Sequence, residues 1–378
     1  MKHLDTLAMK SLRFTDTYTQ ASHSSYADLC SLNSHYPLRS RAVHFYPRHA
    51  PYPRVRIYDV LNSLGYRTAI ISSQNEKWGS MHNYLNSERL DHFLHAENFK
   101  GNTYVSENDL GFASFVRTNK LSGKIDDRLT ISEVIKWIGD ENKDPFFVYI
   151  NLQNSHIPFP VPADFEKKFS PAEPDFPLYF ADFPKDKIGE VKDFYSDSLR
   201  YVDAQIGRLL GFLKERGIMD DTIIVFTSDN GGSCMPGTPT KRPTSNFPLR
   251  ASKGWNYEGG IRIPTFITWP GNIPAMKTDE PVITMDLYPT LLELTGCKQL
   301  PKQTVDGRSL VSLIHGKTKT LDRPFLAWWY PHANGHGTQP CQTILKDGWK
   351  LVHWMNQNET ELYRLDDDVG ERLSLIHI

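Results

Sequence analysis

Continuous apolar segments that alternate with helical patterns are the feature that most constrains the fold of this chain. Strands that are buried on both faces carry unbroken runs of β-branched and aromatic residues, and they belong to sheets that helices cover. We therefore predict an α/β fold in which helices sandwich a large mixed, mostly parallel sheet. The four segments are 67–72 (RTAIIS), 145–151 (PFFVYIN), 222–228 (TIIVFTS) and 261–268 (IRIPTFIT).

The pattern changes near Thr318, where short aromatic segments replace the long alternation. These segments are separated by turns such as Asp347-Gly348, which is typical of antiparallel strands. We predict an α/β domain over 1–317 and a small C-terminal antiparallel subdomain over 318–372. The three predicted strands of this subdomain are 325–330, 341–345 and 349–354.

Composition disfavours several classes of partner and site. The formal net charge is −1 and there is no long basic run, so we do not expect nucleic acid or an anionic membrane surface as a partner. No window of 18 apolar residues predicts a transmembrane helix. The four cysteines lie far apart without a CxxC pair, which disfavours a zinc or redox site.

Polar residues directly after the predicted strands are the candidates for chemistry, because ligands bind at the carboxyl ends of such strands. Asp229 and Asn230 follow the strand at 222–228 and offer oxygen ligands for Ca²⁺ or Mg²⁺, or simply form an Asx turn. Lys253 lies in a glycine-rich loop and can reach an oxyanion, unless it is merely solvated. His156 follows the strand at 145–151 and can donate a proton to a leaving oxygen, or is structural.

These elements, in this order, resemble the sulfatase family of the alkaline phosphatase superfamily. The resemblance implies that Asp229 and Asn230 bind one divalent cation, Ca²⁺ first, with Mg²⁺ and Mn²⁺ as alternatives. It also implies that Lys253 and His156 bind sulfate oxygens. The matching segments are 4–21, 201–232 (through FTSDNGG), 253–264 (KGWNYEGGIRIP), 282–296 (VITMDLYPTLLELTG), 305–310 and 361–371.

The nucleophile motif departs from the family pattern. The family carries Cys or Ser in [CS]-x-P-S-R and oxidises it to formylglycine, and the flanking segments align that position with Ser24. Tyr26 replaces the proline and Asp28 the arginine that the modifying machinery reads, so formylglycine at Ser24 is doubtful. An unmodified serine forms an ester that water must cleave, which raises the expectation of a phosphoryl substrate. Ser24 should begin a helix whose N-terminus holds an anion, unless it only caps that helix.

The remaining candidates for substrate binding are Ser25, Lys77, His82 and Arg262. Ser25, the next residue, is the alternative to Ser24 at the nucleophile position. Where the family has Gly-Lys-Trp-His, this chain has SSQNEKWG at 72–79, and Lys77 and His82 could substitute. The carboxylates of Asp28 and Glu76 would favour binding of a second cation, or of a cationic group on the substrate, at this site.

Both ends of the sequence depart from the family as well. The family opens with a strand that ends in paired aspartates, and we expect this chain to begin after that strand, with an exposed sheet edge as the result. The resemblance stops at Glu371-Arg372, and 373–378 (LSLIHI) reads as a translated sequencing adapter. Family members are often exported, but a truncated start gives no indication of localisation.

Three functions are compatible with these residues and motifs. The leading hypothesis is a sulfuric ester hydrolase that cleaves a sulfated carbohydrate or aryl sulfate at a divalent metal. The second is a phosphomonoester or phosphodiester hydrolase that uses unmodified Ser24. The third is a non-catalytic relative that binds anionic glycans. The substrate should be selected by the loops at 157–187, 233–250 and 331–340.

Overall fold

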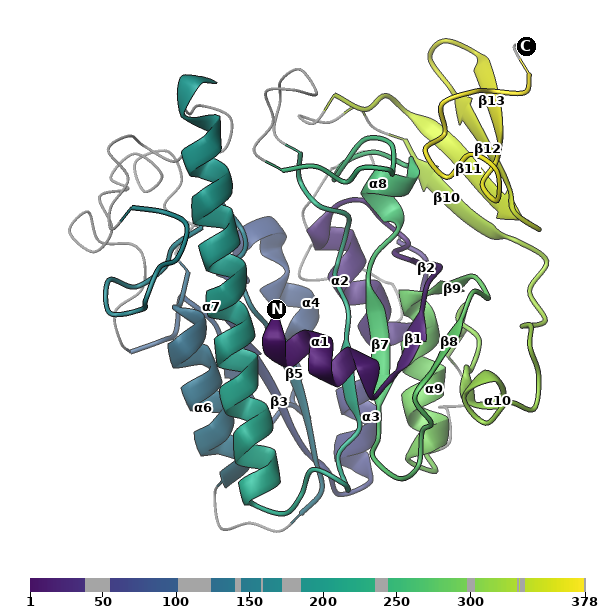
Figure 1. The fold of residues 1–378 in the computed structure, drawn as a ribbon. Coiled ribbons are helices and arrows are strands. Elements are labelled where there is room, and N and C mark those ends of the chain that lie inside the picture. The colour runs from purple at the N-terminus through teal and green to yellow at the C-terminus, as the bar shows by residue number, and fades with distance from the viewer. Residues whose placement is uncertain are drawn as a thin grey trace.

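The structure is a computed structural model that describes residues 1–37, 55–100, 124–139, 144–157, 159–171, 185–234, 244–297, 303–331, 333 and 337–376. Its α/β part carries a separate antiparallel sheet near the C-terminus (Figure 1). The helices of the α/β part are α1 (Lys2–Met9), α2 (Ser24–Asn33), α3 (Ile57–Ser63), α4 (His82–Leu85), α6 (Asp127–Gly139), α7 (Ile188–Glu215), α8 (Glu258–Ile261), α9 (Leu287–Leu294) and α10 (Val311–Ile314). Short 3₁₀ turns occupy Trp78–Ser80, Lys185–Lys187 and Thr284–Asp286.

Among the described residues, the strands of the α/β part form three hydrogen-bonded groups. In the first, β3 (Arg67–Ser72) is parallel to both β4 (His92–Leu94) and β5 (Phe146–Asn151). The second has the order β6-β7-β1-β8, with β7 antiparallel to its two neighbours and β1 parallel to β8. A parallel pair, β2 and β9, forms the third. The bounds are β1 Leu12–Phe14, β2 Thr17–Tyr18, β6 Ile224–Phe226, β7 Thr265–Thr268, β8 Met276–Thr278 and β9 Val282–Ile283.

The predicted α/β class with mixed, mostly parallel strands is confirmed. The apolar runs at 67–72 and 145–151 form β3 and β5, and 222–228 contains β6. The prediction was wrong at 261–268, where Ile261 closes α8 and β7 begins only at Thr265. Pro264 separates the two, and a proline lacks the N–H that a ladder requires.

A cavity of about 2130 Å³ lies between the three-stranded and the four-stranded sheets. Among the described residues, β5 pairs only with β3 and β6 only with β7, and side chains of both strands line the cavity. Helix α7 lines it too, as do Leu4 and Leu7 of α1. Ser24, Asp229 and Lys253 belong to the same lining, so the candidate site opens into the interior between the sheets.

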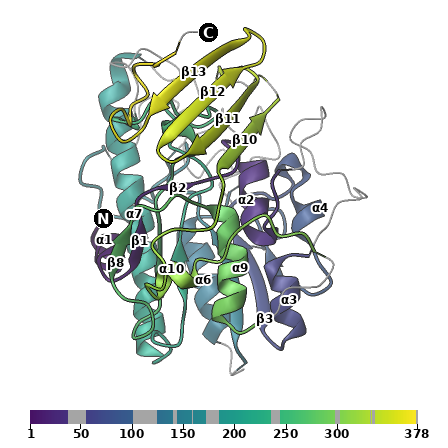
Figure 2. The same ribbon diagram turned by 90° about the vertical axis from the view of Figure 1, so that its right-hand side faces the viewer.

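The C-terminal sheet is antiparallel throughout, as predicted, and Figure 2 shows it at one end of the molecule. Its order is β10-β11-β12-β13, in which β13 was not predicted. Apolar side chains of this sheet pack on Tyr257 and Ile261 at the two ends of α8. No described helix is long and apolar enough to cross a bilayer. The bounds are β10 Leu326–Tyr330, β11 Cys341–Lys346, β12 Trp349–Trp354 and β13 Glu359–Arg364.

Candidate active site

Ser24 is the first residue of α2, and two polar side chains from distant loops converge on its hydroxyl. Lys253 donates from Nζ to Ser24 Oγ at 3.0 Å, and Asn230 donates from Nδ2 to the same oxygen at 3.2 Å. Ser24 and Asn230 are 8% and 7% exposed, so little water competes for these contacts. The positive end of the α2 dipole adds to an environment that favours negative charge on or near Oγ.

Close backbone contact fixes the loop after β6 against the turn that contains α8. Gly231 donates its N–H to the carbonyl of Gly260 at 2.9 Å, and Lys253 donates its N–H to the carbonyl of Gly232 at 3.1 Å. A Cβ on Gly231 would lie 2.0 Å from the carbonyl oxygen of Gly259. Glycine is therefore required for the approach that brings Asn230 and Lys253 to one hydroxyl.

Asp28, one helical turn after Ser24 on α2, is influenced by two other carboxylates. Burial first, and then the charges of Asp229 and Glu76, raise the pKa of Asp28 well above its usual value, while Lys253 opposes this shift. Burial also raises the pKa of Glu76, whose Oε1 accepts from Ser72 Oγ at 2.5 Å. A cation close to Asp229 would relieve this accumulation of negative charge.

The residues around Asp229 offer the hard oxygen donors that a divalent cation prefers. Asp229 offers its carboxylate. The Nδ2 of Asn230 contacts that carboxylate. Rotating the Asn230 amide by half a turn would place Oδ1 there instead, as a second oxygen ligand. The described residues contain no group of three or more His, Cys, Asp or Glu arranged to hold a metal. Asp229 and Asn230 thus fit as two ligands, short of a full coordination sphere.

His156 lies in the loop after β5, with its ring close to the carbonyl of the next residue. Its Nδ1 is 2.8 Å from the carbonyl oxygen of Ile157, which can only accept, so Nδ1 carries the proton. Nε2 is therefore protonated only in the imidazolium form. Asp127 at the start of α6 holds this loop by accepting the N–H groups of Gln153 and Asn154 at 2.8 and 2.9 Å. Burial raises the pKa of Asp127 to about 6.

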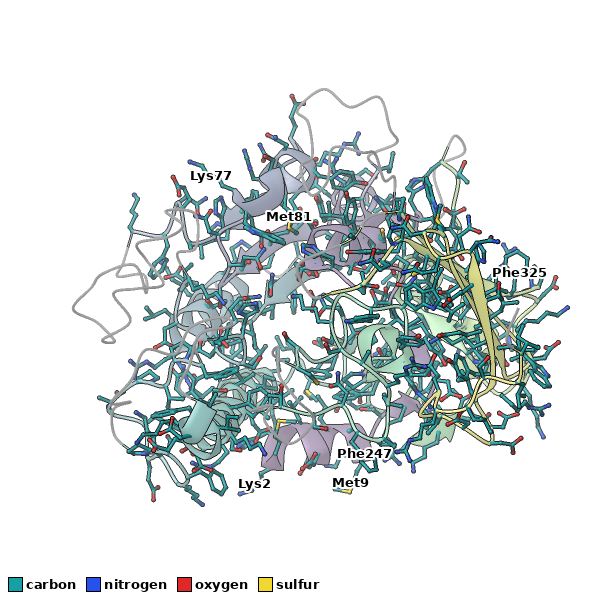
Figure 3. The ribbon with its side chains drawn as sticks, turned by 90° about the horizontal axis from the view of Figure 1, so that it is seen from above. Lys2, Met9, Lys77, Met81, Phe247 and Phe325 are labelled. Atoms are coloured by element: carbon teal, nitrogen blue, oxygen red, sulfur yellow. The ribbon has the colours of Figure 1, made fainter. Side chains whose placement is uncertain are left out.

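The other predicted substrate-binding residues have different contacts. Ser25 is fully buried, with Oγ 3.1 Å from His23 Nδ1. Lys77 pairs with Glu97 at 2.6 Å and lies at the surface in Figure 3. Arg262 pairs with Asp16 and donates to the Thr15 carbonyl.

His82 donates its backbone N–H to the carbonyl of Glu76. Among the described residues, no hydrogen bond or ion pair joins Lys77, His82 or Arg262 to Ser24. Residues 172–184, 235–243, 332 and 334–336 of the predicted substrate loops lie outside the described residues.

The comparison with protein families decides where the chain belongs. The family described as sulfatase matches residues 1–297, and the family described as N-sulphoglucosamine sulphohydrolase, C-terminal, matches residues 251–377. The chain belongs to the sulfatase family. Membership implies a divalent metal ion.

Curated sulfatases share moderate identity with this sulfatase-family chain. A sulfatase of Formosa agariphila is 31% identical over 263 residues, which cover 64% of this chain and 44% of that protein. Human arylsulfatase A is 28% identical over 337 residues, which cover 84% of this chain and 63% of that protein. The chain thus spans less than two thirds of the length of either relative.

Solved structures share the fold of this chain. The structure of Ps i-CgsB in complex with k-i-k-neocarrahexaose has a TM-score of 0.73 at 21% identity, covering 99% of this chain and 82% of that one. The phosphonate monoester hydrolase of Agrobacterium radiobacter has a TM-score of 0.68 at 18% identity, covering 99% and 86%. Both likenesses concern the fold alone.

One cation near the candidate site was missed in the sequence. Lys124 precedes α6 and is 8% exposed, and its Nζ donates to the carbonyl of Ile157 at 3.4 Å. The candidates were residues that follow predicted strands or that lie in segments resembling the family, and Lys124 belongs to neither group. No local pattern marks a lysine before a helix as buried.

Proposed function

We propose that the protein hydrolyses a sulfate ester of a carbohydrate or an aryl alcohol, with unmodified Ser24 as the nucleophile. The observation that carries the proposal is the pair of donors, Lys253 Nζ and Asn230 Nδ2, on Ser24 Oγ. The Lys253 contact stabilises negative charge on that oxygen, which is what an attacking serine develops, and a bound cation would take over this role from Asn230 Nδ2 when the amide presents Oδ1 to it. Family membership supports sulfate as the ester, and the oligosaccharide bound to Ps i-CgsB favours a glycan.

The reaction requires two displacements at sulfur. Ser24 Oγ bonds to sulfur as its proton leaves to water, and the bond between sulfur and the leaving oxygen breaks. The imidazolium of His156 gives its Nε2 proton to that leaving oxygen. Water then attacks the serine sulfate, releasing sulfate and restoring the hydroxyl. Lys253 neutralises charge on the sulfuryl oxygens in both steps.

A divalent cation, Ca²⁺ or else Mg²⁺ or Mn²⁺, would be held by Asp229 and Asn230. When bound, it supplies positive charge to the oxygens of the reacting group. Asn230 contacts both the Ser24 hydroxyl and the Asp229 carboxylate, so a cation held by Asp229 and Asn230 would lie near Ser24.

Phosphate ester hydrolysis is the second candidate. A serine without the second hydroxyl of a formylglycine hydrate depends on water to cleave its ester, as serine phosphohydrolases do. Tyr26 and Asp28, at the positions that the modifying machinery reads, favour this unmodified state.

Hydrolysis of 4-nitrophenyl sulfate, 4-nitrophenyl phosphate and the phosphodiester, each with Ca²⁺, Mg²⁺ or Mn²⁺, tests the proposal. We expect sulfate turnover that Ser24→Ala lowers by more than about a thousandfold. Ser196→Ala on the exposed side of α7 is the matched control and should retain activity. Turnover of phosphoesters alone would assign the protein to the second candidate, and unchanged turnover in Ser24→Ala would overturn the role of Ser24.

A further inference from the structure

Lys124 is a buried cation that the proposed reaction does not use. Its Nζ and the Nδ1 of His156 share one acceptor, the carbonyl oxygen of Ile157, at 3.4 and 2.8 Å. The ammonium group is therefore fixed next to the imidazole that is to protonate the leaving oxygen. Lys124 also lines the cavity that Ser24 and Lys253 line.

Lys124 and Lys253 line the same cavity, and the charge of Lys253 acts on Lys124. Burial and then the charge of Lys253 lower the pKa of Lys124 to about 7, while Asp127 acts in the opposite direction. Among the described residues neither lysine forms an ion pair with a carboxylate. The carboxylate of Asp127 already accepts from Ser73 Oγ at 2.6 Å and from two backbone N–H groups.

Two like charges in a poorly solvated space repel, and an anion between them converts that repulsion into attraction. Lys77 does not supply this charge, because Glu97 holds it at the surface. Lys124 thus provides buried positive charge beside His156 and within the field of Lys253.

We propose that Lys124 is an anion-binding residue that grips the tetrahedral oxyanion of the substrate together with Lys253 and His156. This inference rests on the proposed function, since it assigns the same site a third cationic contact. It predicts that the site binds the inorganic anion even without an ester.

The test is calorimetric titration of inorganic sulfate, and separately of inorganic phosphate, into the protein and its variants. Lys124→Met should weaken binding of the preferred anion about 10- to 100-fold, the range for losing one charged hydrogen bond. Lys136→Met is the matched control, because Lys136 is 75% exposed on α6, and it should leave binding unchanged. Lys124→Arg should retain most of the affinity.

Proton uptake separates anion binding from a structural role. Near pH 8 an anion recharges Lys124, so binding should take up a proton, seen as heats that depend on the buffer, and Lys124→Met should abolish this uptake. A Lys124→Met protein that unfolds more easily yet binds the anion with unchanged affinity would overturn the inference. So would an unaltered protein that binds neither anion. Binding through Lys124 without turnover of any ester would contradict the proposed reaction alone.

Discussion

Asp28 lies one helical turn after Ser24 on α2, so both side chains project from the same face of that helix toward the cavity. An acidic group thus stands close to a site that is to bind an anion. Its raised pKa follows from burial and from its acidic neighbours. A proton or a nearby cation must offset this charge before an anion can bind.

Removing the ionisation of Asp28 should stabilise the protein at neutral pH. Its folded pKa lies above the usual 3.8, so its contribution to stability is complete below 3.8 and is lost as pH rises through the folded value. Asp28→Asn should therefore raise the melting temperature at pH 8 more than at pH 5 in the absence of divalent cations. Thermal unfolding of both proteins at the two pH values measures this. An equal change in melting temperature at both pH values would contradict the raised pKa of Asp28.

The sequence located part of the site because strand ends converge in α/β sheets. Asn230 and Lys253 meet at Ser24, as the order of the motifs indicated. The contacts of Lys77 and Arg262 could not be predicted, because their partners Glu97 and Asp16 become neighbours only in the fold. Lys124 was missed because a lysine before a helix has no local pattern that marks it as buried.

At the scale of elements, a buried ion cluster fastens the C-terminal sheet to the α8 turn. Lys350 of β12 is fully buried and pairs with Glu258 at 2.9 Å and Glu371 at 2.8 Å. Glu371 also accepts the N–H of Glu258 at 2.7 Å, and Tyr18 donates to Glu258 at 3.1 Å. The cluster therefore fixes the segment that positions Lys253.

Lys350→Met should lower the free energy of unfolding by about 3–5 kcal/mol, because buried Glu371 loses its cation and buried Glu258 keeps only Arg262 at 3.4 Å. Urea unfolding followed by fluorescence measures the loss, with exposed Lys346→Met of β11 as the control. A cost similar to that of the control would show that the carboxylates do not depend on Lys350.

The elements whose apolar residues follow a clear pattern along the chain were predicted well. Strands β3 and β12 have the predicted bounds, since their residues form short apolar and aromatic runs bounded by turns. Strand β13 (ETELYR) was missed because it is mostly polar and forms only by pairing with β12. The separation of the sheets into groups depends on pairing between distant segments, which the sequence does not display.

At the scale of the whole molecule, the site joins the three-stranded and four-stranded groups. Asp229 and Asn230 follow β6, while the loop that carries His156 follows β5 across the cavity. A ligand that bridges these loops would hold the two sides together. Binding at the site should therefore stabilise the global fold as well as the local loop.

Ca²⁺ should raise the melting temperature of the protein, and EDTA should reverse the rise. At a free Ca²⁺ concentration of 100 times the dissociation constant, the free energy of unfolding should rise by about 2.7 kcal/mol. Asp229→Ala should remove most of this effect, whereas Asp220→Asn at an exposed position should retain it. If Asp229→Ala responds to Ca²⁺, Mg²⁺ or Mn²⁺ as fully as the unaltered protein does, the ligand assignment is wrong.

The proposed reaction depends above all on Ser24 as the nucleophile, and trapping the ester on this residue is the sharpest test. The protein is mixed with 4-nitrophenyl sulfate, quenched in acid during turnover, and its peptides are analysed by mass spectrometry. We expect one added sulfuryl group on the peptide that contains Ser24, with the side chain otherwise unmodified, and none in Ser24→Ala. Turnover without any adduct at Ser24, or a formylglycine at that position, would contradict the assignment.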